Sequence, residues 1–309
     1  MIAAMSAPSC TYGSIDSSTF GSPPQTRLVP AEALYYLEEG LEGVKRHQYR
    51  SVRSFITTIS KQIKEFQFGG AAQYAVYSPV SDEEFTKIDN ARERDLKGGL
   101  KFLYLTNERV LIVKFIVSIV HEVAHRRFVW IFMRKAVSTG FCKDFTDIGR
   151  TRFSGIGSEK EADTSLIPTS RTPGTGWPTV VFECGVLESL ERQRVDARWW
   201  LENSKGEVGT AIVVATSKQT RSLHVEIWEL VDMPDPDITR ANPDPFITGV
   251  VTKTGEGDIV GEVVTGAPLK ISFKKTMLRD PDDTRGEHDF VFDEKDFKEV
   301  AQIAWAISG

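Results

Sequence analysis

Apolar and polar positions follow two different periods along the chain, and these periods divide it into helices and strands. Apolar residues repeat at helical spacing in five stretches, which predicts helices there. The first begins near Ala31, and the others cover residues 52–66, 108–138, 187–203 and 294–307. In the segment SPVSDEEFTKI, a Ser or Asp is predicted to cap a further short helix.

Short runs rich in Val, Ile and aromatic residues predict the strands. In the centre of the chain these runs cover residues 151–157, 161–168, 179–185, 209–216 and 223–230. Farther along, ITGVVTKT, GDIVGEVVTG and LKISFKK alternate as antiparallel strands do. Residues 101–106 fit a strand or a short helix equally well.

The order of elements between residues 110 and 230 indicates the fold class. It is helix, three strands, helix and two strands, which predicts an α/β protein with a mixed central sheet flanked by helices. We expect a disordered tail (1–30), a helical N-terminal region (31–107), a core (108–231), and a linker with a strand-rich extension and a terminal helix (232–309).

Composition narrows the class of protein further. The chain has 309 residues and a net charge of −5, so it lacks the bulk basicity of a general nucleic-acid coat protein. Its three cysteines, Cys10, Cys142 and Cys184, form no zinc pattern and suggest a reducing compartment. The apolar stretch 110–120 contains Lys114 and is too short to span a membrane. We expect an intracellular protein with no membrane partner, in the nucleus or the cytoplasm.

Two acidic residues within predicted strands are the first candidates for chemistry. Asp163 and Glu183 are separated by a loop rich in Pro and Gly, and a buried carboxylate needs a partner or a metal ion. Mg²⁺ prefers oxygen ligands and could orient water at a phosphodiester. Alternatively, Asp163 caps a turn and Glu183 pairs with Arg194 or Arg198.

Three segments resemble the PD-(D/E)xK, or restriction-endonuclease-like, family of nucleases. They are EADTSLIP, WPTVVFECGV and the helix containing LERQRVDARWW, and the resemblance is strongest to fungal proteins in which KEAD, WPTVVFE and DARWWL recur. The likeness spans about 40% of the chain, taking the nuclease-like unit as one ordinary domain. It implies a restriction-endonuclease-like core at residues 108–231.

The resemblance also implies roles for individual residues. Asp163 and Glu183 match the acidic positions and would hold Mg²⁺ or Mn²⁺, while Glu122 matches a Glu that often precedes the sheet. Gly185 stands where the family has Lys. Some members place the positive charge on the following helix, where Arg194 or Arg198 could supply it, although Arg is a poor base. The resemblance therefore implies a metal-dependent nuclease acting on DNA or RNA, or a non-catalytic binding protein with the same fold.

A second motif indicates a different enzyme class. His121, Glu122 and His125 fit the HExxH pattern, in which two histidines on one helix face bind Zn²⁺ and the Glu acts as general base. A zinc metallopeptidase is therefore a further alternative. No third ligand follows at the usual close spacing, and the same face carries apolar residues, as packed histidines would require.

Tryptophans and arginines are interleaved between residues 177 and 200. Aromatic rings that stack on bases, together with arginines that contact phosphates, are typical of single-stranded nucleic-acid binding. Paired tryptophans on a helix are more often part of a core, so we expect at least one of Trp199 and Trp200 to be buried.

Overall fold

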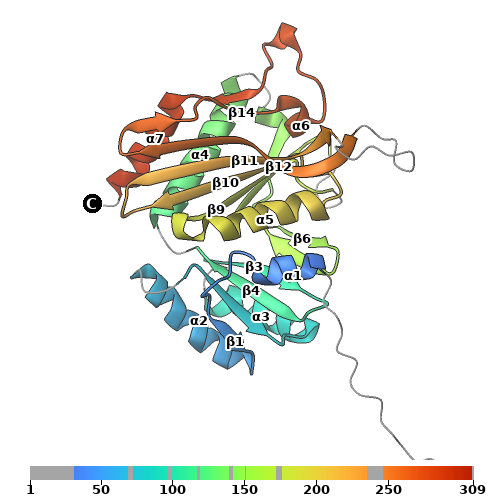
Figure 1. Ribbon diagram of the computed structural model, residues 1–309, viewed down its shortest axis with the longest axis vertical. Coiled ribbons are helices and arrows are strands. Elements are labelled where there is room, and N and C mark those ends of the chain that lie inside the picture. The colour runs from blue at the N-terminus through green and yellow to red at the C-terminus, as the bar shows by residue number, and fades with distance from the viewer. Residues whose placement is uncertain are drawn as a thin grey trace, which may run out of the picture.

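The computed structural model shows an α/β protein with two main sheets (Figure 1). It describes residues 31–68, 72–96, 99–116, 119–138, 142–149, 151–171, 176–234 and 246–307. The predicted tail 1–30 lies outside these ranges, as does most of the predicted linker. Mixed sheets flanked by helices and a strand-rich C-terminal part confirm the predicted fold class.

The smaller sheet is built mainly from the N-terminal part of the chain. Its spatial order is β1-β2-β4-β3-β7-β6. The strands are β1 (Arg46–Gln48), β2 (Tyr74–Ser78), β3 (Leu100–Leu105), β4 (Val110–Phe115), β6 (Arg152–Gly155) and β7 (Ser158–Glu161). Two helices, α2 (Val52–Gln67) and α3 (Asp82–Asp95), pack on one face, and Ser81 caps α3 as predicted. The region 31–107, expected to be helical, thus also supplies three strands.

One predicted helix proved to be a strand followed by a helix. Residues 108–138 were expected to form one long helix, but Val110–Phe115 is strand β4 and helix α4 covers Ile119–Ser138. All six β4 side chains are buried because the strand pairs with β2 on one side and β3 on the other. A short continuous apolar run fits a buried strand and a buried helix equally well, so the apolar pattern could not separate them.

The larger sheet contains the segments that resemble the nuclease family. Its spatial order is β13-β12-β11-β10-β9-β8-β5. The strands are β5 (Phe145–Asp147), β8 (Thr164–Pro168), β9 (Val180–Val186), β10 (Thr210–Ser217), β11 (Ser222–Pro234), β12 (Phe246–Val260) and β13 (Val263–Thr265). β8 is antiparallel to β9, and helix α5 (Leu190–Asn203) connects β9 to the parallel strand β10. The predicted strand at 151–157 is β6, which joins the smaller sheet; β5, which the sequence did not predict, takes the place beside β8.

Helices cover both faces of the larger sheet (Figure 1). Strand alternation sends Phe182 and Ile212 toward α4, and Val181 and Val213 toward α5. The α4 side is completed by α7 (Glu294–Ala306), the predicted terminal helix, and by the hairpin of β14 (Leu269–Ile271) and β15 (Phe290–Phe292). A short helix, α6 (Phe273–Met277), lies between those two strands.

Helix α5 lies between the two sheets, and its apolar residues join them into one core. Trp199 and Trp200 are fully buried there, which confirms their expected core role. The same cluster contains Tyr74 and Leu103 of the smaller sheet and Val181 of the larger one. Helix α1 (Ala31–Glu38) packs on this cluster through Tyr36 and Leu37. The interface between the sheets is therefore a packed interior in which any charged group must find a partner.

Candidate functional site

Asp163 and Glu183 meet at the junction of the two sheets. Asp163 lies in the link between β7 and β8, and Glu183 lies in the middle of β9. The ammonium of Lys114, on β4, is 2.7 Å from Asp163 Oδ2 and 2.7 Å from Glu183 Oε2. Lys114 shares its strand face with Ile112, and this face points toward α5. The fold therefore brings together both predicted acidic residues and adds a lysine between them.

Further ion pairs extend from this centre. Lys160 of β7 lies 3.1 Å from Glu183 Oε1 and 3.2 Å from Asp196 Oδ1 of α5. Trp200 Nε1 donates to Glu183 Oε1 at 2.7 Å, and the backbone NH of Cys184 donates to Asp163 Oδ2 at 2.7 Å. We call Lys114, Lys160, Asp163, Glu183 and Asp196 the Lys114 cluster.

Burial and opposite charge act against each other in this cluster. Burial alone would raise the pKa of Asp163, but Lys114 and Lys101 outweigh it and hold that pKa at about 2. Burial lowers the pKa of Lys114, and the carboxylates of Asp163 and Glu183 more than offset this, so its pKa lies well above the usual value. At neutral pH Asp163 and Lys114 are therefore both charged, and each stabilises the charge of the other.

Buried cations at this site match or outnumber the buried carboxylates. Three cations, Lys114, Lys160 and Arg192, face three carboxylates, because Arg192 lies 3.7 Å from Asp196. A fourth cation, Lys101, donates to the carbonyl of Ala162. Burial is the largest influence on Lys101 and lowers its pKa to about 8. No excess of negative charge is left for a divalent cation to neutralise.

Space and access also argue against a divalent cation at this centre. Side-chain exposure is 3% for Asp163, 1% for Glu183 and 4% for Lys114. The cavity beside Lys101, Lys114, Lys160 and Asp196 has a volume of about 10 Å³, no more than one water requires. Both Glu183 oxygens are engaged, so of the carboxylate oxygens of Asp163 and Glu183 only Asp163 Oδ1 is buried without a hydrogen-bond partner among the described residues. The donor set as folded therefore does not fit Mg²⁺ or Mn²⁺, which require several oxygen ligands and retained water.

The other predicted site residues lie away from the carboxylate pair. Glu122 pairs with the exposed Arg126 one turn along α4. Arg194 reaches Glu226 on β11, with its Nε 3.1 Å and 3.0 Å from the two carboxylate oxygens. Arg198 bonds Glu202 at 2.6 Å. The alternative pairing of Glu183 with Arg194 or Arg198 is therefore not what the structure shows.

Gly185 departs from the family pattern for a steric reason. A Cβ built at this position would lie 2.7 Å from Gln193 Nε2 and would also collide with Gln73 Oε1. Both glutamines are buried and bond to the backbone of Val186. A lysine cannot occupy this position with its neighbours in place, and the lysine that contacts the two carboxylates, Lys114, comes from another strand, β4.

The HExxH helix does not assemble a zinc site. His121 is held by a hydrogen bond to the backbone of Thr216, and burial lowers its pKa to about 4. His125 is buried, and its pKa is also lowered to about 4, mainly by burial. Among the described residues, no third metal-binding side chain joins these two histidines at a separation that suits a shared ion. His125 packs as a core histidine, the alternative that the sequence left open, whereas His121 is half-buried.

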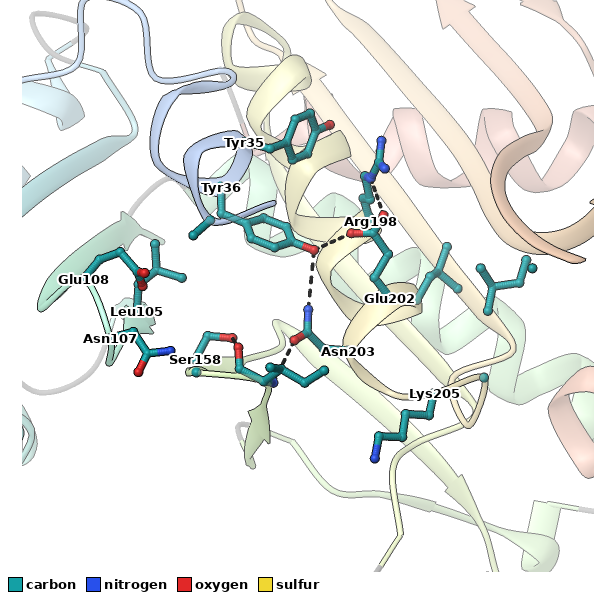
Figure 2. A pocket seen from close by; sticks show the side chains of 17 residues that line it. Tyr35, Tyr36, Leu105, Asn107, Glu108, Ser158, Arg198, Glu202, Asn203 and Lys205 are labelled. Carbon is teal, nitrogen blue, oxygen red and sulfur yellow. Dashed lines mark hydrogen bonds and ion pairs between the residues drawn. The ribbon is translucent and has the colours of Figure 1, made fainter. Parts of the chain in front are cut away.

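A pocket of about 640 Å³ opens between α1, α5 and the β3–β4 and β6–β7 turns (Figure 2). Arg198 lies over the ring of Tyr35, 4.8 Å from its centre. Tyr36 donates to Glu202 and accepts a hydrogen bond from Asn203 Nδ2. We call this space the Arg198 pocket. Lys205 and Asn107 also line it, so it combines aromatic, amide and cationic groups in one concave site.

Lys114 and Lys160 were missed as site residues, although the sequence held a signal for each. Lys114 interrupts an apolar run, which is expensive unless a carboxylate meets it. Lys160 begins the KEAD segment, three residues before Asp163. Neither signal could identify Asp163 and Glu183 as the partners of these lysines, because the strand that contains Lys114 was predicted as a helix.

Comparisons with known proteins give little further guidance. No family model matches the chain, and no curated protein matches it. Among solved structures, the chain is similar to a crystal structure from Anabaena variabilis described as a "putative nuclease belonging to DUF820". The two share 12% identity over 72% of this chain and 99% of the other, with a TM-score of 0.38. Similarity at this level establishes no function for this chain.

Proposed function

We propose that the chain is a non-catalytic binding protein built on a nuclease-like α/β core. The observation that carries this proposal is Lys114, whose ammonium lies at 2.7 Å from both Asp163 and Glu183. It takes the position in which a divalent cation would neutralise the same two carboxylates. With all three side chains at most 4% exposed, a phosphodiester has no path by which to reach the carboxylates.

The Arg198 pocket is the site where we propose that a partner binds. A single-stranded nucleic acid suits its chemistry, because a base can stack on the face of an aromatic ring while cations contact the backbone. Tyr35 offers the ring, and Asn107 and Asn203 offer amides for the base edge. Arg198 is already neutralised by Glu202, so Lys205 at the rim is the cation available to a phosphate.

Fluorescence anisotropy with labelled single-stranded DNA and RNA tests this proposal. We expect binding that weakens with added salt, and a loss of affinity of at least about fivefold in Tyr35→Ala, since stacking contributes about 1–3 kcal/mol per base. Lys298→Ala, an exposed lysine on α7, is the matched control and should bind as the native chain does. Absence of binding, or equal loss in the control variant, would contradict the proposed partner.

A metal-dependent nuclease remains the second candidate function, and one observation favours it. Asp163 Oδ1 is buried without a hydrogen-bond partner, which in native proteins often marks an ion or water that completes the site. In that case Asp163 and Glu183 would hold Mg²⁺ or Mn²⁺, and Lys114 would stabilise negative charge on the phosphate. The smaller sheet would have to move away from β9 first. Metal-dependent cleavage of DNA or RNA by the native chain would establish this candidate.

A further inference from the structure

A cluster of one histidine and three carboxylates lies on the larger sheet, away from the Lys114 cluster. His224 and Glu226 belong to β11, and the residues directly opposite them on β12 are Asp258 and Glu256. Side chains two residues apart on a strand share a face. All four therefore lie on one face of the sheet, the face that α5 covers, because Arg194 of α5 contacts Glu226.

The buried member of the cluster orients the histidine. Glu226 Oε1 lies 3.0 Å from His224 Nε2, and Glu226 is fully buried. Glu226 is itself bonded by Arg194, by Lys253 and by the indole NH of Trp228 at 2.9 Å. With Nε2–H donated to this fixed carboxylate, His224 Nδ1 faces Asp258, and the proton between these two groups is the one that a metal ion would displace. A carboxylate that holds the far nitrogen of a histidine in this way is a usual feature of metal-ligating imidazoles.

The other two carboxylates flank the imidazole ring, with Asp258 at Nδ1 and Glu256 Oε1 3.6 Å from Nε2. His224 Nδ1 lies 2.7 Å from Asp258 Oδ1, and donor atoms of His224, Glu256 and Asp258 lie within 4.8 Å of one another. Ligand atoms bound at about 2.0–2.1 Å in a tetrahedral zinc site are about 3.3 Å apart, so only small side-chain shifts are required. Asp258 and Glu256 are 40% and 43% exposed, which leaves an open side for water and for entry of an ion.

Charge in this cluster differs from that in the Lys114 cluster. Glu226, Glu256 and Asp258 face two permanent cations, Arg194 and Lys253. When a metal ion replaces the proton between His224 Nδ1 and Asp258, the imidazole is neutral and one negative charge is left over for the ion, whereas the Lys114 cluster has none. We propose that His224, Glu256 and Asp258 bind a divalent transition-metal ion of the Zn²⁺ class, with Glu226 as the residue that positions the imidazole. An imidazole with carboxylates selects such ions over Mg²⁺.

Isothermal titration of the full chain with Zn²⁺, after treatment with a chelator, tests the proposal. We expect one equivalent to bind, and at least a tenfold loss of affinity in Glu256→Gln and in Asp258→Asn, both of which change partly exposed side chains and should fold normally. His288→Gln, at an exposed histidine elsewhere, is the matched control and should leave binding unchanged.

Three results would overturn the assignment. One is the absence of zinc binding by the native chain. Another is equal binding by the native chain and Asp258→Asn. The third is a loss of zinc binding in His125→Gln with Asp258→Asn unaffected, which would place the ion at the HExxH helix instead. Folding of each variant is checked by circular dichroism, and Glu256→Gln provides a second reading if Asp258→Asn fails to fold.

Discussion

Replacing Lys114 with methionine tests the electrostatic reasoning most sharply. Methionine keeps much of the length and apolar stem of lysine but removes the charge that lies 2.7 Å from both Asp163 and Glu183. Removing one partner of a buried ion pair typically costs about 3–5 kcal/mol because the remaining charge stays buried without compensation. Lys160 still contacts Glu183, whereas Asp163 keeps the Cys184 backbone NH and weaker interactions with Lys101 and His125. We therefore expect a loss of about 3–5 kcal/mol in the free energy of unfolding.

Urea unfolding followed by tryptophan fluorescence measures this loss, since Trp200 bonds directly to Glu183. Adding Asp163→Asn to Lys114→Met removes the orphaned charge and should restore part of the stability, because buried pairs are more costly to break than to replace. A Lys114→Met variant within about 0.5 kcal/mol of the native chain, the range of ordinary surface substitutions, would refute the reasoning. Stabilisation of Lys114→Met by Mg²⁺, absent in the double variant, would show that an ion can take the ammonium's place.

Three further predictions concern pH and packing. His125 has a pKa of about 4 in the fold against about 6.5 unfolded, so its stabilising contribution is present above pH 6.5 and is lost as pH falls toward 4. Urea midpoints at pH 7 and pH 4.5 should differ less in His125→Asn than in the native chain, and equal differences would contradict the assignment. Lys101 has a pKa of about 8 against 10.5 unfolded, so its cost of about 3 kcal/mol is present below pH 8 and is relieved as pH rises to 10.5. The stability advantage of Lys101→Met over the native chain should shrink across that interval, and a constant difference would argue against a buried, perturbed lysine. In Gly185→Ala the new methyl group would clash with Gln73 and Gln193 and should lower the free energy of unfolding by about 1–3 kcal/mol, measured by thermal or urea unfolding. No loss of stability would show that these two glutamines can move aside without cost.

Much of the larger sheet could be predicted because its segments are long and regularly patterned. Helix α5, the strands β8 to β11 and helix α7 all lie where the apolar spacing placed them. The strand–helix order around Asp163 and Glu183 follows from those elements, and it put both carboxylates at one junction. The predicted extension differs in two respects. ITGVVTKT and the start of GDIVGEVVTG form a single strand, β12, and only the first three residues of LKISFKK form a strand, β14, before helix α6 begins.

The smaller sheet was harder to predict because its strands are short or completely buried. Apolar and polar residues do not alternate along β4 because both of its faces are buried. From the sequence, an apolar strand of this kind cannot be distinguished from the first turns of the helix that follows it. That one error concealed Lys114 as a partner for the carboxylates. Ion-pair partners depend on which elements become neighbours in space. The sequence distance from Asp163 therefore could not predict that Arg194 pairs with Glu226, or that Glu122 pairs with Arg126.

Cleavage of single- and double-stranded DNA and of RNA by the native chain, with Mg²⁺ or Mn²⁺ and with a chelator, tests the central claim most directly. The Lys114 cluster predicts that no substrate is cut faster with metal than with chelator. Glu183→Gln, which keeps the shape of the side chain, serves as the matched variant and should behave identically in this assay. Metal-dependent cleavage by the native chain that Glu183→Gln lacks would contradict a site closed by Lys114 and would establish the nuclease.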